Sequence, residues 1–68
     1  MADIPIKTEY IKLDSFLKMT GEVVTGGHAK MIIQNGEISV NGEVCTMRGK
    51  KLRPGDTVKV NNKEFTVK

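Results

Sequence analysis

A run of basic side chains between positions 48 and 53 is the densest source of binding chemistry in the sequence. Arg48, Lys50, Lys51 and Arg53 supply four of the eleven basic residues within six positions, and positions 47–53 contain no acidic residue. Both residue types bind phosphate, arginine as a planar fork and lysine as a point charge. The run therefore indicates an anionic partner, nucleic acid first. The alternative is a loop whose charges contact only water.

A second group with binding chemistry lies at the start of an expected helix. Thr25 is a typical N-cap residue, and Gly26 and Gly27 follow it. The first amides of a helix lack internal acceptors and carry the positive end of the helix dipole, so they can bind a phosphate. Two glycines at this point leave room for the phosphate to approach closely. His28 and Lys30 add donors nearby. The alternative is an ordinary flexible helix start.

Catalytic chemistry has little support in the sequence. Cys45 and His28 are the sole cysteine and histidine, and Cys45 stands in an alternating pattern where a free cysteine usually behaves as a small hydrophobe. An activated nucleophile also needs a third group to orient its base. One cysteine and one histidine cannot complete a structural zinc site, and glycine-rich cofactor motifs are absent. We expect no enzyme activity, no cofactor and no metal.

Length and composition describe a small basic protein. The 68 residues make one domain, 1–68, with net charge +3 and no second cysteine for an internal disulfide. No apolar run approaches the roughly 20 residues of a membrane span. The N-terminus lacks the basic start and apolar core of a signal peptide. We expect a cytoplasmic monomer with no membrane partner.

The spacing of apolar residues predicts two helices that position these groups. Ala29, Ile32 and Ile33 share one face of a helix that Thr25 begins and Gly36 ends, and Lys30 lies on the opposite face. A first helix is predicted over 13–20, where Leu13, Phe16 and Leu17 form the apolar face and Gly21 ends the helix. Because the link between the helices is short, we expect them to pack together.

A hairpin should follow the second helix. The segment 38–40 alternates, and Asn41-Gly42 is a strong signal for a two-residue turn that requires positive φ at both positions. The return strand is predicted over about 44–47. A strict two-residue turn places Val44 on the opposite face from Cys45, so either a bulge or a covered second face is needed.

The remaining segments predict further strands. Residues 3–11 form an extended arm, with a short strand that Pro5 confines to a sheet edge. The sequence over 53–56 fits a type II turn with Gly55 at its third position. The segments 57–60 and 64–67 alternate and predict a second hairpin. A turn around positions 62–63 would pair Val60 with Phe65, and Val58 with Val67.

Together these elements predict an α+β fold, with two helices on one side of a small antiparallel or mixed sheet. The expected core consists of Leu13, Phe16, Leu17, Ala29, Ile32, Ile33, Ile38, Val40, Leu52, Val58, Val60, Phe65 and Val67. The basic residues of the two helices and those at 48–53 can form one surface only if the N-termini of the helices lie near residues 48–53.

Fixed positions spread through most of the chain resemble one known family. They are Lys12-Leu13-Asp14-x-x-Leu17, Gly21, Thr25-x-x-x-Ala29-x-x-Ile32-Ile33-x-x-Gly36-x-Ile38-x-Val40-Asn41-Gly42 and Leu52-x-Pro54-Gly55-Asp56-x-Val58-x-Val60. This pattern resembles the RNA-binding domain named after the fourth small-subunit ribosomal protein, the S-four or alpha-L domain. The match covers about residues 11–60, and the chain is similar to the stand-alone bacterial type of the family (the YbcJ and YaaA type).

The resemblance implies a pair of helices on a small sheet and binding to structured RNA, either ribosomal or transfer RNA, with the ribosome as a further partner. The same surface follows from the residues and from the resemblance. It comprises Lys12, Lys18, Thr25, Gly26, Gly27, His28, Lys30, Arg48, Lys50, Lys51 and Arg53. The alternative function is a protein-interaction adaptor associated with ribosomes or RNA-modifying enzymes.

Two positions depart from the usual family pattern. Lys12 stands where the family usually has arginine, and Thr25-Gly26 stand where it often has Ser-Arg. Losing an arginine fork at Gly26 removes a bidentate phosphate contact. Binding then depends more on helix amides and on the 48–53 run. Because a single tyrosine, Tyr10, is not a base-stacking platform of the kind that single-strand binders use, we expect recognition of RNA shape and backbone, not stacking on splayed bases.

Overall fold

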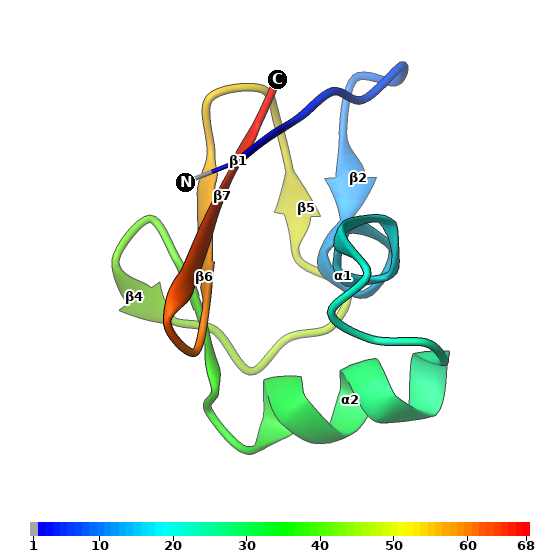
Figure 1. Ribbon diagram of the computed structural model, residues 1–68, viewed down its shortest axis with the longest axis vertical. Coiled ribbons are helices and arrows are strands. Elements are labelled where there is room, and N and C mark those ends of the chain that lie inside the picture. Colours follow the sequence, from blue (N-terminus) through cyan, green and yellow to red (C-terminus); the bar gives the residue numbers. More distant parts are fainter. Residues whose placement is uncertain (1) are drawn as a thin grey trace.

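The computed structural model describes residues 2–68, which form two helices and seven strands (Figure 1). In chain order, the elements are β1 (Ala2–Ile4), β2 (Ile11–Lys12), α1 (Leu13–Thr20), α2 (Gly26–Gln34), β3 (Ile38–Val40), β4 (Glu43–Val44), β5 (Lys51–Leu52), β6 (Thr57–Val60) and β7 (Lys63–Val67). Within this part of the chain, neither helix has the length and apolar character required to cross a bilayer.

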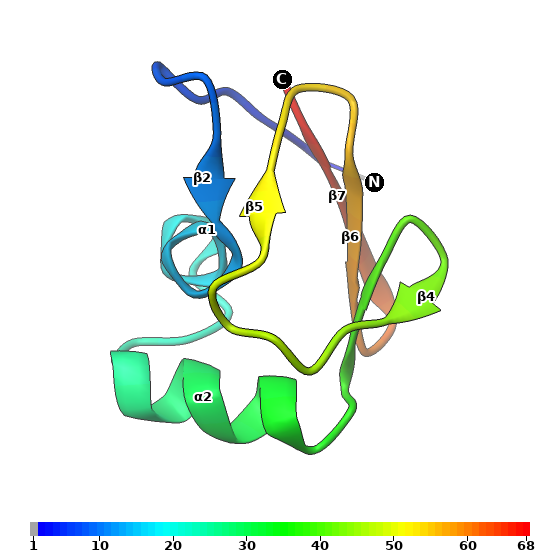
Figure 2. The same cartoon turned by 180° about the vertical axis from the view of Figure 1, so that it is seen from behind.

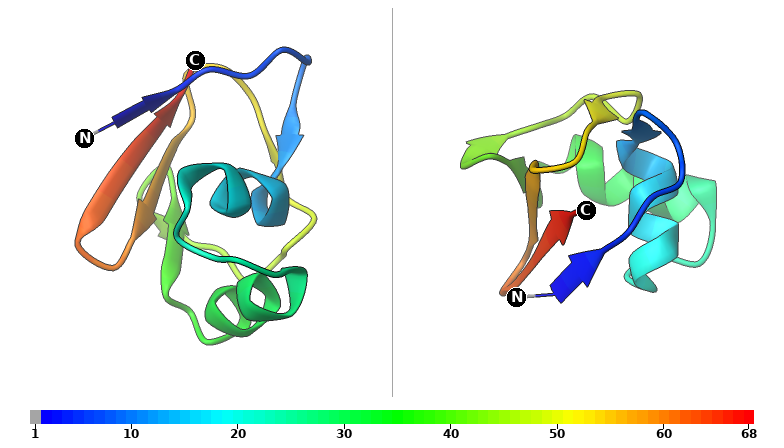
Figure 3. Two further views of the ribbon diagram at one scale, coloured as in Figure 1. Left: turned by 45° about the vertical axis from the view of Figure 1, so that its right-hand side comes forward. Right: turned by 90° about the horizontal axis from the view of Figure 1, so that it is seen from above.

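The strands form two sheets. The larger sheet has five strands in the order β1-β7-β6-β3-β4, with β1 parallel to β7 and the other neighbours antiparallel. The smaller sheet is the antiparallel pair of β2 and β5, which lie side by side in Figure 2. Both helices lie on one side of the larger sheet (Figure 3). The predicted α+β fold with a mixed sheet is therefore confirmed.

Both helices begin and end as their sequences predict. α1 occupies the expected residues 13–20, and Gly21 follows it with φ +82°, a left-handed conformation that glycine adopts at low cost. α2 follows Thr25, whose hydroxyl oxygen accepts a hydrogen bond from the His28 amide at 3.1 Å. Gly36, after the second helix, has φ +78°.

The core matches the expected apolar set with two differences. Every expected residue is buried except Ile32, which is half-buried against the core, and Val23 from the link between the helices is buried as well. Phe16 of α1 and Phe65 of β7 meet edge to face with ring centroids 6.4 Å apart. This aromatic pair joins the first helix to β7 of the larger sheet.

The β3–β4 hairpin has a strict two-residue turn. Asn41 and Gly42 have φ 52° and 88°, and Val40 pairs with Glu43. Val44 turns to the open face of the sheet, where it is 63% exposed, so no bulge is needed. The predicted return strand over 44–47 is too long, because pairing ends at Val44 and the chain then crosses toward α1.

The predicted pairing of the last two strands is wrong by two residues. The turn lies at Asn61-Asn62, so Val60 pairs with Lys63, and Val58 with Phe65. Asn61 adopts φ 54°, which asparagine tolerates better than most residues. Because side chains alternate with a period of two, this shift leaves the same apolar residues facing the core.

The β2–β5 pair is the element that the sequence did not predict. The predicted arm over 3–11 contributes β1, at an edge of the larger sheet as expected, and its end enters β2. Residues 51–52, expected to lie in a basic loop, form β5. Ile11 and Leu52 face each other and pack against the core, which explains why this pairing is favourable.

Candidate nucleic-acid interface

The β2–β5 pair places Lys12 directly opposite Lys51. Opposed residues of an antiparallel pair project to the same face, with Cβ atoms about 5 Å apart. Ile11 and Leu52, the neighbouring pair, occupy the inner face, and Leu52 is fully buried. Lys12 and Lys51 therefore share the outer face, and both side chains are exposed.

The basic run is joined to the start of α1 by backbone hydrogen bonds. The Leu13 amide donates to the Lys50 carbonyl at 2.9 Å, and the Asp14 amide donates to the Arg48 carbonyl at 3.2 Å. These two amides at the start of α1 are consequently occupied. The start of this helix offers a ligand the Lys12 side chain rather than these amide groups.

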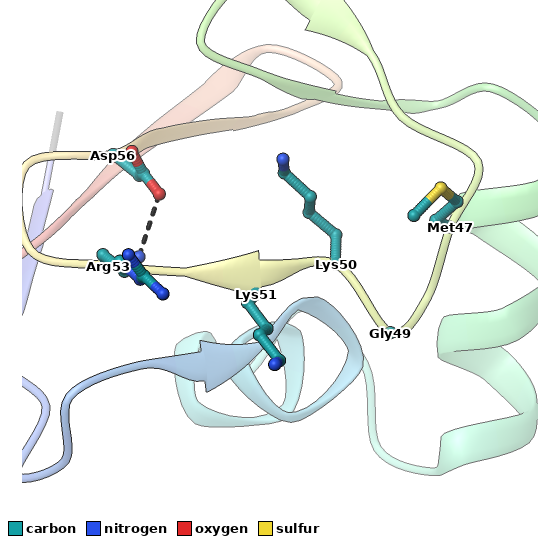
Figure 4. Close-up of a pocket in the computed structure, with 6 residues that line it drawn as sticks. All are labelled: Met47, Gly49, Lys50, Lys51, Arg53 and Asp56. Atoms are coloured by element: carbon teal, nitrogen blue, oxygen red, sulfur yellow. Dashed lines mark hydrogen bonds between the residues drawn. The ribbon is translucent and has the colours of Figure 1, made fainter.

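The side chains of Lys50 and Lys51 point to opposite sides of the β5 backbone (Figure 4). Lys51 extends toward β2, whereas Lys50 extends toward the β3–β4 hairpin. The pocket in this region is lined by Met47, Gly49, Lys50, Lys51, Arg53 and Asp56. The Asp56 carboxylate accepts a hydrogen bond from the Arg53 amide at 2.9 Å, within the predicted 53–56 turn. That turn is confirmed, since the Asp56 amide donates to the Arg53 carbonyl and Gly55 has φ +101°.

The start of α2 forms a second group beside this one. Within residues 2–68, the amides of Gly26 and Gly27 donate to no acceptor. A Cβ atom added at Gly26 would meet no atom within 4 Å, and one at Gly27 would meet only the Thr25 hydroxyl oxygen at 3.9 Å. His28 and Lys30 are exposed. This helix start is therefore capped, free of obstruction and open to a ligand.

Few basic residues have a carboxylate partner in the described part of the chain. The ion pairs within residues 2–68 are Lys63 with Glu22 at 3.2 Å and Lys68 with Asp3 at 3.6 Å. Outside the predicted surface, Lys7 and Lys59 form no ion pair within residues 2–68, although Lys59 stands opposite Glu64 across β6 and β7. The seven basic residues of the predicted surface are exposed and form no ion pair within residues 2–68; they are Lys12, Lys18, Lys30, Arg48, Lys50, Lys51 and Arg53.

The structure brings most of the predicted residues to neighbouring positions. The start of α1, the β2–β5 pair and the loop before β5 appear together in Figure 2, with the first turn of α2 beside α1. Lys18 is the outlier, because it lies in the last turn of α1, at the opposite end from Lys12. We use the term cationic surface for the following set: Lys12, Lys30, Arg48, Lys50, Lys51, Arg53 and the start of α2 at Thr25, Gly26, Gly27 and His28.

One neighbour of the cationic surface was not among the predicted residues. The Lys51 ammonium nitrogen lies 4.9 Å from the centroid of the Tyr10 ring. Tyr10 precedes Lys12 by two positions, a spacing that places both on one face of an extended segment. That spacing is the signal in the sequence that would have associated Tyr10 with this surface.

Cys45 takes a structural position. Its thiol donates to the Met47 carbonyl at 3.6 Å, and the side chain packs against the core. His28 is engaged through its backbone amide with Thr25. Among residues 2–68, no group of three or more potential metal ligands is present.

Comparisons with known proteins give consistent similarities. A family model described as an S4 domain matches residues 4–68. The Bacillus subtilis protein named "Probable ribosome maturation protein RlbA" is 42% identical over 57 residues, which cover 84% of this chain and 80% of that protein. The solution structure of YbcJ from E. coli, described as containing an alfaL motif involved in RNA-binding, matches with TM-score 0.74 and 31% identity over 98% of this chain and 86% of YbcJ.

A more distant similarity concerns the fold alone. The 30S ribosomal protein S4e from Thermoplasma acidophilum matches with TM-score 0.66 and 17% identity. The match covers 88% of this chain and 32% of S4e.

Proposed function

Because the chain belongs to the S4 domain family, we propose that it binds structured RNA, without catalysis, through the cationic surface. The observation that carries this proposal is the gathering of exposed, unpaired cations at the cationic surface. The basic residues of the cationic surface are exposed and form no ion pair within residues 2–68, and Lys12 stands directly opposite Lys51. Unpaired, exposed cations gathered around two helix starts favour a polyanionic ligand.

The mechanism divides into neutralisation and orientation. Lys12 and Lys51 project side by side from the β2–β5 pair and contact phosphates of one RNA backbone, and Arg48 extends the contact along the loop. Lys50 contributes its charge from the other side of β5, toward the β3–β4 hairpin. The unpaired amides at the start of α2 donate hydrogen bonds to a further phosphate and fix the direction of the helix relative to the RNA. Contacts of this kind read the shape and backbone of folded RNA.

The target in this proposal is ribosomal RNA or a ribosomal particle, which the chain binds as a cytoplasmic monomer. The name of the Bacillus subtilis relative, a probable ribosome maturation protein, supports this choice. Sedimentation of the tagged protein with ribosomal particles through a sucrose gradient tests it. If co-sedimenting protein moves to the free fraction after nuclease treatment, RNA holds it there. If it stays with other proteins, the molecule is an adaptor.

Charge reversal provides the direct test of the cationic surface. Lys51→Glu and Lys63→Glu each lower the net charge from +3 to +1, since each replaces one positive by one negative charge. We expect Lys51→Glu to abolish binding to ribosomal RNA fragments, whereas Lys63→Glu retains it. Equal losses in the two variants would show that only the net charge matters and would contradict a localised surface.

Salt dependence measures how many phosphates the protein contacts. If four to six phosphates are neutralised, log affinity should fall with log salt with a slope of roughly −3 to −5. Electrophoretic or anisotropy titrations of an RNA fragment at several salt concentrations give this slope. A flat response would exclude phosphate neutralisation as the basis of binding.

A further inference from the structure

Tyr10 is the aromatic residue that is not packed in the core. Phe16 and Phe65 pack against each other inside the molecule, whereas Tyr10 is 36% exposed beside the cationic surface. Nucleic-acid-binding proteins stack bases on exposed aromatic rings that lie next to basic side chains. Tyr10 therefore combines partial exposure with basic surroundings, the combination that base stacking uses.

The Tyr10 ring is held in position by its neighbours. The Lys51 ammonium nitrogen lies 4.9 Å from the ring centroid, within the range of a cation–π contact. The Thr8 hydroxyl donates to the Tyr10 carbonyl at 2.6 Å, which fixes the turn that leads into β2. A ring ordered in this way loses little conformational freedom on binding.

The space beside the ring favours a base over a phosphate. Thr8, Glu9 and Tyr10 line a hollow next to the cationic surface. The Glu9 carboxylate disfavours a phosphate group in this hollow, because like charges repel. A neutral base, whose face can lie on the ring, has no such penalty.

We propose that Tyr10 is a further RNA-binding residue, whose ring stacks on a single unpaired base next to the RNA helix that Lys12 and Lys51 contact. This inference rests on the proposed function. Every base has a stacking face, so the preference is for an unpaired nucleotide at a helix end rather than for one base type. The protein then distinguishes a helix with a protruding nucleotide from a blunt helix.

The test uses three RNA stem-loops that differ only at the end of the stem. One stem is blunt, one carries a single unpaired adenosine at its 3′ end, and one carries it at its 5′ end. We expect the protein to bind one of the extended stem-loops at least five-fold more tightly than the blunt one. Tyr10→Phe keeps this ratio because the ring remains, whereas Tyr10→Leu binds all three with equal affinity.

The fluorescence of Tyr10 gives a second measurement that needs no variant. The sequence contains one tyrosine and no tryptophan, so intrinsic fluorescence reports on this ring alone. We expect stronger quenching by the preferred extended stem-loop than by the blunt one at equal saturation. Equal affinities for all three stem-loops, or equal quenching, would overturn the inference. Binding to the blunt stem-loop would still support the proposed function, whereas failure to bind any RNA would contradict both.

Discussion

Gly26 stands at the position where, by the resemblance described above, the family often has arginine. It begins α2, its φ lies outside the left-handed region, and a Cβ atom added there meets no atom within 4 Å. A side chain at this position would extend from the cationic surface into open space. Neither strain nor crowding therefore requires glycine here.

We expect Gly26→Arg to raise RNA affinity by roughly ten-fold, because a guanidinium fork adds charge-assisted hydrogen bonds to phosphate. Gly26→Ala is the matched control. It stabilises the helix by about 0.5–1 kcal/mol through lower backbone entropy but adds no donor. Binding titrations and urea unfolding of both variants separate the two effects. An equal gain in affinity from alanine would assign the effect to helix stability.

At the residue scale, the sequence predicts which basic residues lie near one another. It predicts less well the directions in which their side chains point. Lys50 and Lys51 were expected to act together, yet they extend to opposite sides of β5. Their directions depend on β5 pairing with β2, and that pairing joins segments about 40 positions apart. The contact of Lys51 with Tyr10 has the same origin and was missed for the same reason.

At the element scale, the sequence predicts long helices and strands more accurately than short ones. The helices were predicted closely because α1 and α2 show a clear apolar periodicity and have capping residues. The strands β2 and β5 have two residues each, too few to show any period. Their pairing depends on a long-range contact between Ile11 and Leu52, which a local pattern does not contain.

Asn41 links the β3–β4 hairpin to the turn that precedes β6. Its side-chain amide donates to the Asp56 carboxylate at 3.2 Å, and its side-chain oxygen accepts from the Thr57 amide at 3.0 Å. Asn41 also adopts φ 52°, a left-handed conformation. This one residue therefore supports two turns.

We expect Asn41→Gly to destabilise the protein by about 1–2 kcal/mol, because it loses two hydrogen bonds and keeps the backbone conformation. Asn41→Ala should cost about 1 kcal/mol more, since alanine is strained at positive φ. Urea unfolding measures both changes. Asn61→Gly is the control, since Asn61 has φ 54° but makes no side-chain hydrogen bond within residues 2–68. A comparable loss in this control would mean that the turn conformation, not the side-chain bonds, supplies the stability.

At the scale of the whole molecule, stability depends on a small core, and a single cysteine cannot add an internal disulfide to it. A core in a domain of this size contributes roughly 3–5 kcal/mol net. Leu52 is fully buried and belongs to β5, the strand that carries Lys51. Its packing therefore supports both the fold and the placement of the cationic surface.

We expect Leu52→Ala to remove about 2–5 kcal/mol, a loss large enough to leave much of the protein unfolded at 25 °C. Ile33→Val, a milder change at another fully buried position, should cost about 0.5–1.5 kcal/mol and leave the protein folded. Circular dichroism during urea titration distinguishes these outcomes. A Leu52→Ala variant as stable as the parent would contradict the role of the β2–β5 pair in the core.

The juxtaposition of Lys12 and Lys51 has a consequence for the protein without its ligand. Two like charges directly opposed on an antiparallel pair repel each other, and this repulsion weakens the pair by up to about 1 kcal/mol. Dissolved ions that screen the repulsion should raise the melting temperature of the free protein while they release the nucleic acid. The free molecule thus carries a destabilising charge repulsion at the cationic surface, which a polyanion bound there, as proposed above, would reduce.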